Sequence, residues 1–568
     1  MSMRPGPWPD VPALTAQVAD AAFPGGSLAI RIRDELGAWC PDEAFAGVYG
    51  IRGAPGISPA QLAVVTALQF AGNLTDRQAA DAVRGRIDWK YCLGLELADA
   101  GFDFSVLSEF RGRLVAGSAE RLLLDLLLAR LKERGLVKAG GRARTDSTHV
   151  LARIRDLNRL ELAGESVRAA LEALAAAVPG WLAGVIDVSW QRVYGQRIQE
   201  MRLPESAAKR AELAVQYARD GYWLLERLQA PDAPPGARDL PAVRVLRTVL
   251  IQQFYRSDGE AGQEVIWREE ENNGGYGLPP GRARIVSPYD PDARYGEKRG
   301  KGWLGYKAHY TETVSDPAGD DPATGRPVHP NIVTGAQTTA AAVHDVKMTG
   351  PVHDQHAQRG LAPGEHAADS GYASAEELIA ARQRGITLIA PLPADTSRQA
   401  RTGGYTAGMF AIDWDAGQVT CPQGAVSGSW TPCRQHGTDV IVVRFPAAAC
   451  RACPARDNCT TATRTGRQLT LRTRQAHEAI TATRAEQATA TWRRRYATRA
   501  GVEGLMAQVT HVTGIRRARY LGLPKTTLEH NIAAVAVNLV RLDAWWTWTP
   551  LDRGHTSHLQ RLQFTLAA

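Results

Sequence analysis

The order in which helical and strand-like segments alternate is the feature that most constrains the fold of this chain. From about residue 58 to residue 136 apolar residues recur with helical spacing. The period changes at Ala143, where Ala-Arg-Thr-Asp-Ser-Thr-His-Val predicts a strand. A second helical block covers about 161–257, and strand-like segments then return. This order predicts a mixed α/β core that is interrupted by a helical insertion.

The later strands and helices can be placed from their periodicity. One strand is expected over 305–314, because its residues alternate and place Lys307 and His309 on one face. Shorter strands are expected over 329–334, 365–368 and 386–391, and helices over 475–508 and 528–546.

Charge and hydropathy narrow the class of protein. Lys and Arg number 67 against 59 Asp and Glu, a net charge of +8, and this modest basic excess fits a nucleic-acid partner. No apolar run approaches the roughly 18 residues of a membrane span. The first residues lack the basic and apolar parts of a secretory signal. We therefore expect a cytoplasmic protein that does not contact a membrane.

Three acidic residues stand out because of the segments that carry them. Asp146 lies in the strand-like segment Thr-Asp-Ser-Thr-His, and Asp369 follows a short apolar strand and precedes Ser-Gly-Tyr. Glu503 lies in a segment expected to be helical. Tyr496, Arg499 and Glu503 are spaced i, i+3 and i+7, which predicts that they share one helix face. We predict Asp146, Asp369 and Glu503 as the catalytic acids.

Three carboxylates suit phosphodiester chemistry, because hard divalent cations prefer oxygen ligands. Two such cations about 3.5–4 Å apart activate the attacking oxygen and stabilise the leaving oxygen. We expect these acids to bind Mg²⁺, or Mn²⁺ in its place, while Arg499 and Lys307 hold phosphate oxygens. The alternative is that each acid is an ordinary cap or turn residue, because spacing alone does not show that the three converge.

Two other acids compete with Asp369 for the second catalytic position. Asp290 and Asp292 lie in the segment Tyr-Asp-Pro-Asp-Ala-Arg. No apolar strand leads into them, and they precede the strands that should build the core. We therefore rank both below Asp369.

Basic residues near the acids are candidates for contact with DNA. The cluster Ile-Arg-Arg-Ala-Arg follows Glu503 and is expected to meet the phosphate backbone, with a solvated turn as the alternative. His309 is expected either to sense phosphate or to be a satisfied core histidine. The residues predicted to contact DNA are Lys307, His309, Tyr496, Arg499, Arg516, Arg517, Arg519 and Lys525.

Five of the seven cysteines lie between Cys421 and Cys459. A cluster of this kind in a cytosolic protein suggests a metal site before disulfides. Cys421, Cys450, Cys453 and Cys459 suit tetrahedral Zn²⁺ held by thiolates, which would be structural because four protein ligands close the site. Cys433 is a fifth candidate. The alternatives are free buried thiols or a redox pair at Cys450 and Cys453.

Several motifs together resemble insertion-sequence transposases of the DDE superfamily. The resemblance runs through residues 67–114, 145–149, 157–162, 289–294, 305–309 and 368–372. Near the end, Tyr496, Arg499 and Glu503 match the signature Tyr-x2-Arg-x3-Glu-x6-Lys, but Thr510 stands where the signature has lysine. The chain is most similar to the bacterial insertion-sequence family numbered eleven eighty-two, which is related to the larger group numbered four.

The resemblance implies an RNase H-like catalytic core, with the acids on neighbouring elements. It also implies excision at terminal inverted repeats and insertion into target DNA, both double-stranded. Synapsis of two ends favours a homodimer. The expected parts are an N-terminal helical DNA-binding domain (1–138), a core (139–160 and 285–400), a helical insertion (161–284), a small zinc-ribbon-like insertion (401–470) and C-terminal helices that complete the core (471–568).

Two other functions remain open at this stage. The chain is also compatible with an inactive, transposase-derived DNA-binding protein, although retention of all three acids argues against it. A third reading is an RNase H-like nuclease that cuts DNA without strand transfer.

Overall fold

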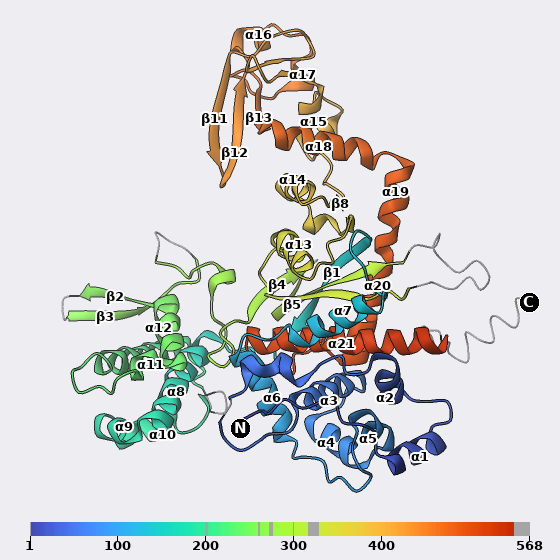
Figure 1. Cartoon of the computed structure of the whole chain (residues 1–568). Helices are drawn as coiled ribbons and strands as arrows, with labels where there is room; N and C mark the ends of the chain where they lie inside the picture. The colour runs from blue at the N-terminus through green and yellow to red at the C-terminus, as the bar shows by residue number, and fades with distance from the viewer. Residues whose placement is uncertain are drawn as a thin grey trace, which may run out of the picture.

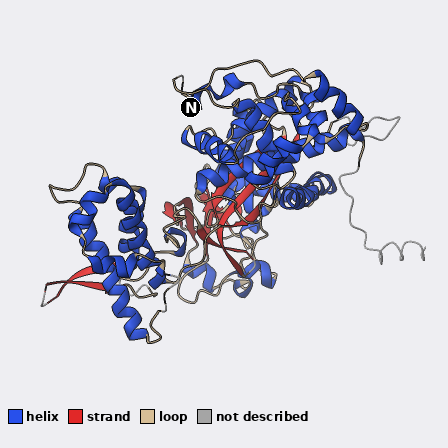
Figure 2. Ribbon diagram, turned by 90° about the horizontal axis from the view of Figure 1, so that it is seen from below, coloured by secondary structure: helices blue, strands red, loops and turns tan. Residues whose placement is uncertain are grey.

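The protein was analysed as a computed structural model, which describes residues 2–50, 52–198, 201, 203–259, 262–271, 276–298, 300–315 and 329–549. A mixed sheet lies at its centre, with helices around it (Figures 1 and 2). The predicted mixed α/β class is therefore confirmed. Its strands are β1 (Arg142–Leu151), β4 (Arg294–Lys298), β5 (Lys301–Val314), β6 (Val333–Ala340), β7 (Glu365–Ala367) and β8 (Thr387–Ile389).

Five of these strands form the order β6-β5-β1-β7-β8. β5 runs antiparallel to both β1 and β6, whereas β7 is parallel to β1 and β8 is parallel to β7. β4 pairs with the first residues of β5 in an antiparallel hairpin. In the long pairing of β1 with β5, Asp146 lies opposite Tyr310 and Ser147 lies opposite His309. The parallel pairing aligns Arg142–Arg144 of β1 with Glu365–Ala367 of β7, so the end of β7 lies beside the middle of β1.

The N-terminal helices and the sheet share one hydrophobic core. The long helix α21 (Leu523–Thr547) lies between them, and every residue from 528 to 539 is buried. A helix that is buried on all sides is typical of such a central position, and here the buried residues include Glu529, His530 and Asn531. The N-terminal helices are α1 (Ala13–Ala22), α2 (Leu28–Arg31), α3 (Pro59–Ala71), α4 (Asp76–Gly85), α5 (Ile87–Leu93), α6 (Ser105–Ala116) and α7 (Leu122–Glu133).

Local capping explains where two of these helices begin. The Ser58 side chain accepts a hydrogen bond from the Gln61 N–H at the start of α3. Thr75 and Gln78 form a capping box at the start of α4, so each side chain satisfies a backbone donor of the other.

The helical insertion packs around a core of its own and extends to one side of the sheet (Figure 1). The Asn158 side chain and Glu161 form a capping box that begins its first helix. Its helical part ends at Gln253, earlier than the predicted end near residue 257, because Phe254–Gly259 pairs with Gly262–Trp267 as two antiparallel strands. Its elements are α8 (Arg159–Ala177), α9 (Pro179–Val185), α10 (Val188–Tyr194), α11 (Ala207–Arg227), α12 (Pro241–Gln253), β2 (Phe254–Gly259) and β3 (Gly262–Trp267).

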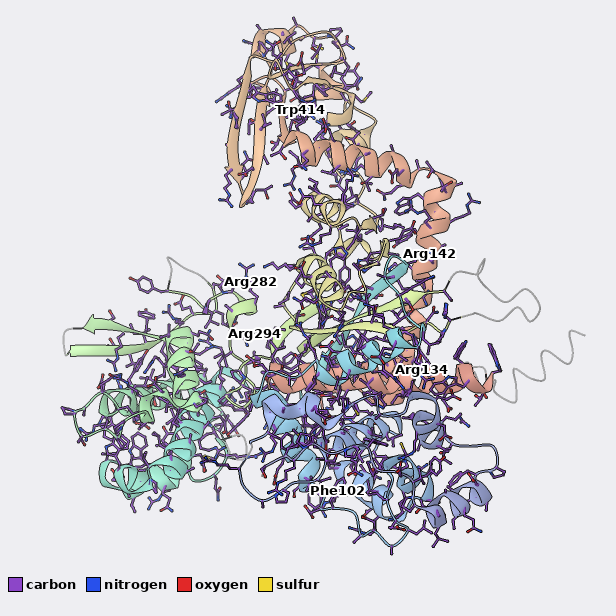
Figure 3. The ribbon with its side chains drawn as sticks, in the orientation of Figure 1. Phe102, Arg134, Arg142, Arg282, Arg294 and Trp414 are labelled. Atoms are coloured by element: carbon purple, nitrogen blue, oxygen red, sulfur yellow. The ribbon has the colours of Figure 1, made fainter. Side chains whose placement is uncertain are left out.

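The cysteine-rich segment also has a separate core, formed around Phe410, Val443 and Phe445. It lies at the opposite end of the molecule from the N-terminal helices, as the positions of Trp414 and Phe102 show (Figure 3). Its elements are α15 (Arg398–Thr402), β9 (Ala411–Asp413), β10 (Gln418–Thr420), β11 (Ser429–Gln435), β12 (Thr438–Arg444), α16 (Ala447–Arg451), α17 (Arg456–Cys459) and β13 (Gln468–Arg472).

Two predictions from periodicity were wrong. The strand expected over 329–334 is instead β6, which begins at Val333. The helix expected over 475–508 is divided into α18 (Arg474–Gln487), α19 (Ala490–Ala497) and α20 (Val502–Thr513), with a 3-10 turn over Thr498–Gly501 between the last two. Helices α13 (Thr349–Gln358) and α14 (Ala375–Gln383) complete the core. In the described part of the chain, no helix has the length and apolar character of a membrane span.

Candidate active site

Asp146 lies in the middle of β1, and both of its carboxylate oxygens are engaged. Oδ1 accepts a hydrogen bond from the Ser147 N–H at 2.7 Å, and Oδ2 accepts one from Arg499 at 2.8 Å. Burial raises the pKa of Asp146, and the nearby Asp369 carboxylate adds to this, while the Ser147 N–H and Arg499 oppose it. The carboxylate is therefore partly desolvated and lies within the field of a second acid.

Asp369 follows β7 directly and caps the short turn Ser370–Tyr372. Its Oδ1 accepts a hydrogen bond from the Gly371 N–H at 2.8 Å, and its Oδ2 lies 3.8 Å from the Arg499 guanidinium. Asp146 and Asp369 are thus brought together around the Arg499 guanidinium, although they are far apart in the sequence. The parallel pairing of β1 with β7 places Asp369, just past the end of β7, beside Asp146 in the middle of β1.

Arg499 reaches these acids from the 3-10 turn that divides the predicted long helix. The cause of the break lies in β1, where Arg144 donates a hydrogen bond to the Thr498 carbonyl oxygen at 2.7 Å. Gly501 lies so close to that guanidinium that a Cβ would stand 2.0 Å from Nη1. The inserted arginine takes a carbonyl that a continuous helix would use, and glycine leaves room for it.

The break changes the predicted arrangement of the third acid. Tyr496 ends up stacked on Trp492, with ring centroids 4.9 Å apart, while Glu503 lies exposed in the first turn of α20. The three residues therefore do not share the face of one continuous helix. Among the contacts of the described residues, none joins Glu503 to Asp146 or Asp369. The structure gathers two of the three predicted acids, with the third on a helix packed against β1.

Asp290 and Asp292, the competing acids, have structural contacts elsewhere. Asp290 is fully buried, and its carboxylate accepts hydrogen bonds from the Tyr306 hydroxyl and the Ala293 N–H. Burial raises its pKa. Asp292 accepts a hydrogen bond from the Leu523 N–H at 3.0 Å and so anchors the start of α21. Both acids support the joint between β5 and α21, away from the Arg499 guanidinium.

Lys307 and His309 project from one face of β5, as the alternation predicts. His309 is buried, and its ring nitrogens pair with the Tyr372 hydroxyl at 2.7 Å and the Thr339 hydroxyl at 3.1 Å. This is the satisfied core histidine that the sequence left as one alternative, and burial lowers its pKa to about 4.

Lys307 is bound by Asp345, an acid that was not singled out from the sequence. With the strand predicted over 329–334, Asp345 did not stand out as a residue near a strand end. The observed β6 ends at Ala340, a few residues before Asp345.

The basic cluster after α20 divides into exposed and bound members. Arg516, Arg517 and Lys525 are exposed. Arg516 donates a hydrogen bond to the Thr148 hydroxyl at 2.9 Å, close to Asp146 on β1. Arg519 instead donates to the Leu74 carbonyl oxygen at 3.0 Å and so ties the cluster to the N-terminal helices.

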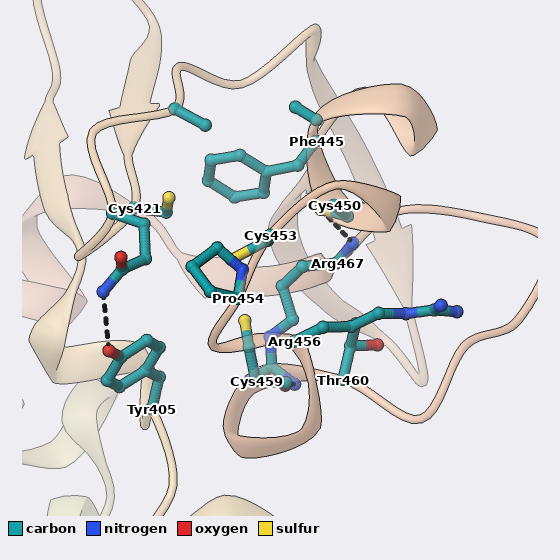
Figure 4. A pocket seen from close by; sticks show the side chains of 13 residues that line it. Tyr405, Cys421, Phe445, Cys450, Cys453, Pro454, Arg456, Cys459, Thr460 and Arg467 are labelled. Atoms are coloured by element: carbon teal, nitrogen blue, oxygen red, sulfur yellow. Dashed lines mark hydrogen bonds between the residues drawn. The ribbon is translucent and has the colours of Figure 1, made fainter.

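Four of the clustered cysteines line a single cavity of about 160 Å³ in the cysteine-rich insertion. Their sulfur atoms lie around it together with Tyr405, Pro454 and Arg467 (Figure 4). The Cys450 sulfur accepts a hydrogen bond from the Arg467 N–H at 3.4 Å. Burial raises the pKa of Cys459, and the other three thiols of the cavity act in the same direction while Arg467 opposes them. These four are Cys421, Cys450, Cys453 and Cys459, whereas Cys433 is exposed on β11.

Neither site holds three candidate ligands in a metal-binding arrangement within the described ranges. At the acidic site, the possible metal ligands that lie together are the Asp146 and Asp369 carboxylates, and both face the Arg499 guanidinium. At the cysteine site, four thiols border one cavity without gathering around a single point.

Two segments of the chain match models of known protein families. A family model described as a transposase DDE domain matches residues 420–543, and one described as a transposase domain matches residues 18–113. Over these two segments the chain is similar to insertion-sequence DDE transposases. The first covers α20 with Glu503, and the second covers the N-terminal helices through most of α6. No curated protein and no solved structure matches the chain.

Proposed function

We propose that this transposase cleaves DNA at the terminal inverted repeats of an insertion sequence and joins the ends to target DNA. Two carboxylates, Asp146 and Asp369, that converge on one guanidinium at a sheet edge carry this proposal. Such a pair suits phosphoryl transfer, because carboxylate-bound cations can stabilise the charge on the attacking and leaving oxygens. The proposed reactions are attack by water on the phosphorus at the element end, followed by attack of the freed 3′-hydroxyl on target DNA.

The donor chemistry at the sheet edge fits a divalent cation. Mg²⁺ is commonly held by one or two carboxylates together with substrate phosphates and water, so two converging acids are sufficient. Asp146 and Asp369 would hold Mg²⁺ or Mn²⁺, which activates the attacking oxygen and stabilises the leaving oxygen. Glu503 is the proposed third acid, from the start of α20. Arg499 would then be free to hold a phosphate oxygen.

We propose that the core is RNase H-like. Three antiparallel strands, β6, β5 and β1, followed by two parallel strands, β7 and β8, support this assignment. The remaining parts are proposed as predicted: an N-terminal DNA-binding domain (1–138), a helical insertion (161–284) and a cysteine-rich insertion (401–470). A homodimer in the cytoplasm is the proposed working form, because synapsis must hold two DNA ends.

The proposed DNA interface uses the exposed basic residues next to the acids. Arg516, Arg517 and Lys525 would contact phosphates, since the first also touches the strand that carries Asp146. Tyr496 and Arg499 would lie nearest the reacting phosphate. Three other candidates form hydrogen bonds within the protein: Lys307 with Asp345, His309 with Tyr372, and Arg519 with the Leu74 carbonyl oxygen before α4.

A structural zinc ion in the cysteine-rich insertion is also proposed. Four thiols around one cavity, with a backbone N–H donated to the Cys450 sulfur, support it. Zinc binding would draw the four sulfurs together, because tetrahedral thiolate sites place each sulfur about 2.3 Å from the metal.

The test is strand cleavage and joining on DNA that carries the element's own ends, which flank its coding region. Asp146→Asn, Asp369→Asn and Glu503→Gln should each abolish both reactions in Mg²⁺ while leaving the fold intact. Asp354→Asn is the matched control, because Asp354 is an exposed acid outside the proposed DNA-binding domain and pairs at the surface with Arg384. Full cleavage by the Asp146→Asn variant would refute the proposal.

Two other outcomes identify the alternatives. Binding of end DNA with no metal-dependent cleavage by the unaltered protein indicates an inactive DNA-binding protein. Cleavage without joined products in the presence of target DNA indicates a nuclease that lacks strand transfer.

A further inference from the structure

We propose that Asp345 is a positioning residue of the acidic site, which joins Lys307 to Ser147 and thereby holds Asp146 in place. This inference rests on the proposed function, since it assigns a role within that same site. Asp345 lies just after β6, at the start of the short turn Asp345–Met348. None of the motifs that suggested the catalytic acids includes it.

Both carboxylate oxygens of Asp345 are occupied by donors from the central strands. Oδ1 accepts a hydrogen bond from Lys307 Nζ on β5 at 2.9 Å, and Oδ2 accepts one from Ser147 Oγ on β1 at 3.1 Å. Lys307 Nζ also donates to the Val343 carbonyl oxygen at 2.8 Å. Asp345 therefore connects two neighbouring strands through its side chain, and the lysine is fixed from two directions.

Ser147 passes this restraint to the catalytic acid. Its hydroxyl is held by Asp345, while its N–H donates to Asp146 Oδ1 at 2.7 Å. Only Oδ2 of Asp146 is left to meet Arg499. Ser147 is itself buried, so its side chain has few other orientations that satisfy its hydroxyl.

Asp345 also lies next to the second acid. A Cβ placed on Gly371 would stand 2.9 Å from Asp369 Oδ1 and 3.6 Å from Asp345 Oδ2. The two carboxylates therefore border the same glycine. Tyr372, which follows it, has a pKa raised by burial first and then by the charges of Asp345, Asp146 and Asp369. The Asp345, Asp146 and Asp369 carboxylates therefore all lie close enough to Tyr372 to raise its pKa.

The charge of Asp345 explains why Lys307 is bound to it. A third carboxylate beside Asp146 and Asp369 would repel both, because like charges at short range in a partly buried site are unfavourable. The Lys307 ammonium offsets that charge, and the Lys307 and Asp345 side chains are only 17% and 16% exposed. Because Asp345 is bonded to Lys307 Nζ and to Ser147 Oγ, the role assigned to it is to act through Ser147.

The test uses the full chain with Asp345→Ala and Asp345→Asn. Asparagine can accept from Lys307 and donate to Ser147 Oγ, so it keeps the contacts and loses only the charge. Partners that orient metal ligands typically change affinity or activity by about 10–100-fold when removed. We expect Asp345→Ala to weaken Mn²⁺ binding, measured by titration calorimetry, by about 10–100-fold. The same loss should be seen in kcat for end cleavage with KM for DNA unchanged, and Asp345→Asn should restore most of both.

Controls separate failure of this inference from failure of the proposed function. Asp146→Asn should remove the calorimetric Mn²⁺ signal, and if it does not, the proposed metal site is wrong. If Asp146→Asn removes it but Asp345→Ala binds Mn²⁺ like the unaltered protein, only the positioning role is overturned. Asp354→Ala is the matched control, since Asp354 forms an exposed ion pair with Arg384 on the neighbouring helices α13 and α14.

Two further outcomes are decisive. If Asp345→Asn is as damaging as Asp146→Asn, the charge and not the contacts matters, and the positioning role is refuted in favour of direct ligation. If Asp345→Ala does not fold, Ser147→Ala takes its place, because it removes the hydroxyl that Asp345 holds. That variant should also weaken Mn²⁺ binding, and unchanged affinity would contradict the role.

Discussion

Glu312 on β5 is the buried anion on which the region behind the acidic site depends. It is fully buried, and its carboxylate accepts hydrogen bonds from Arg144 on β1 and Arg541 on α21. Arg144 is also the residue that binds the Thr498 carbonyl oxygen at the helix break. Glu312→Gln keeps the volume of the side chain, removes its charge and turns one acceptor into a donor that faces guanidinium groups.

The burial of these groups sets the size of the effect. Removing one partner of a buried ion pair typically costs about 3–5 kcal/mol, because the remaining charge stays desolvated. Here two guanidiniums depend on the same carboxylate, and the side chains of Arg144 and Arg541 are only 11% and 8% exposed. We therefore expect a loss in the upper part of that range. The matched control is Glu478→Gln, since Glu478 and Arg474 are 59% and 55% exposed and such helix pairs contribute about 0.3–0.5 kcal/mol.

The assay is urea unfolding followed by circular dichroism. With a denaturant slope of about 3 kcal/mol per molar, a loss of about 4–5 kcal/mol lowers the midpoint of Glu312→Gln by about 1.3–1.7 M. Glu478→Gln should lower it by less than about 0.2 M on the same slope. End cleavage should fall as well, because Arg144 positions the turn that carries Arg499. A midpoint shift for Glu312→Gln no larger than that of Glu478→Gln would refute the reasoning.

Two other predictions concern pH and zinc. Burial raises the pKa of Glu529 to about 8, above its unfolded value of about 4.3, so its contribution to stability is present below about pH 4.5 and is lost as pH rises toward 8. Glu529→Gln should therefore flatten the fall in urea midpoint between pH 5 and 8, and parallel profiles for the two proteins would contradict this. Cys450→Ser should remove zinc from the purified protein, measured by atomic absorption, whereas Cys433→Ser should retain it because Cys433 is exposed outside the cavity. An unaltered protein purified without zinc would overturn the proposed site.

Local sequence determined much of this protein. Ser58 and Thr75 mark helix starts because each side chain caps a donor within three residues of itself. The alternation around Lys307 and His309 fixes the faces of β5 for a similarly local reason, since successive strand residues point to opposite sides. The motifs around Asp146 and Asp369 could also be recognised, because Asp146 lies within β1 and Asp369 follows β7 within two residues.

Only the tertiary structure decided which of these residues meet. Asp369 and not Asp290 lies beside Asp146, because β7 pairs in parallel with β1 while Tyr306 and the Ala293 N–H hold Asp290 elsewhere. Arg144 ends the helix that periodicity extended, since its guanidinium reaches the Thr498 carbonyl oxygen from a distant strand. Periodicity reports which side chains of one segment share a face, whereas these contacts depend on strand pairing and burial between segments far apart in the chain.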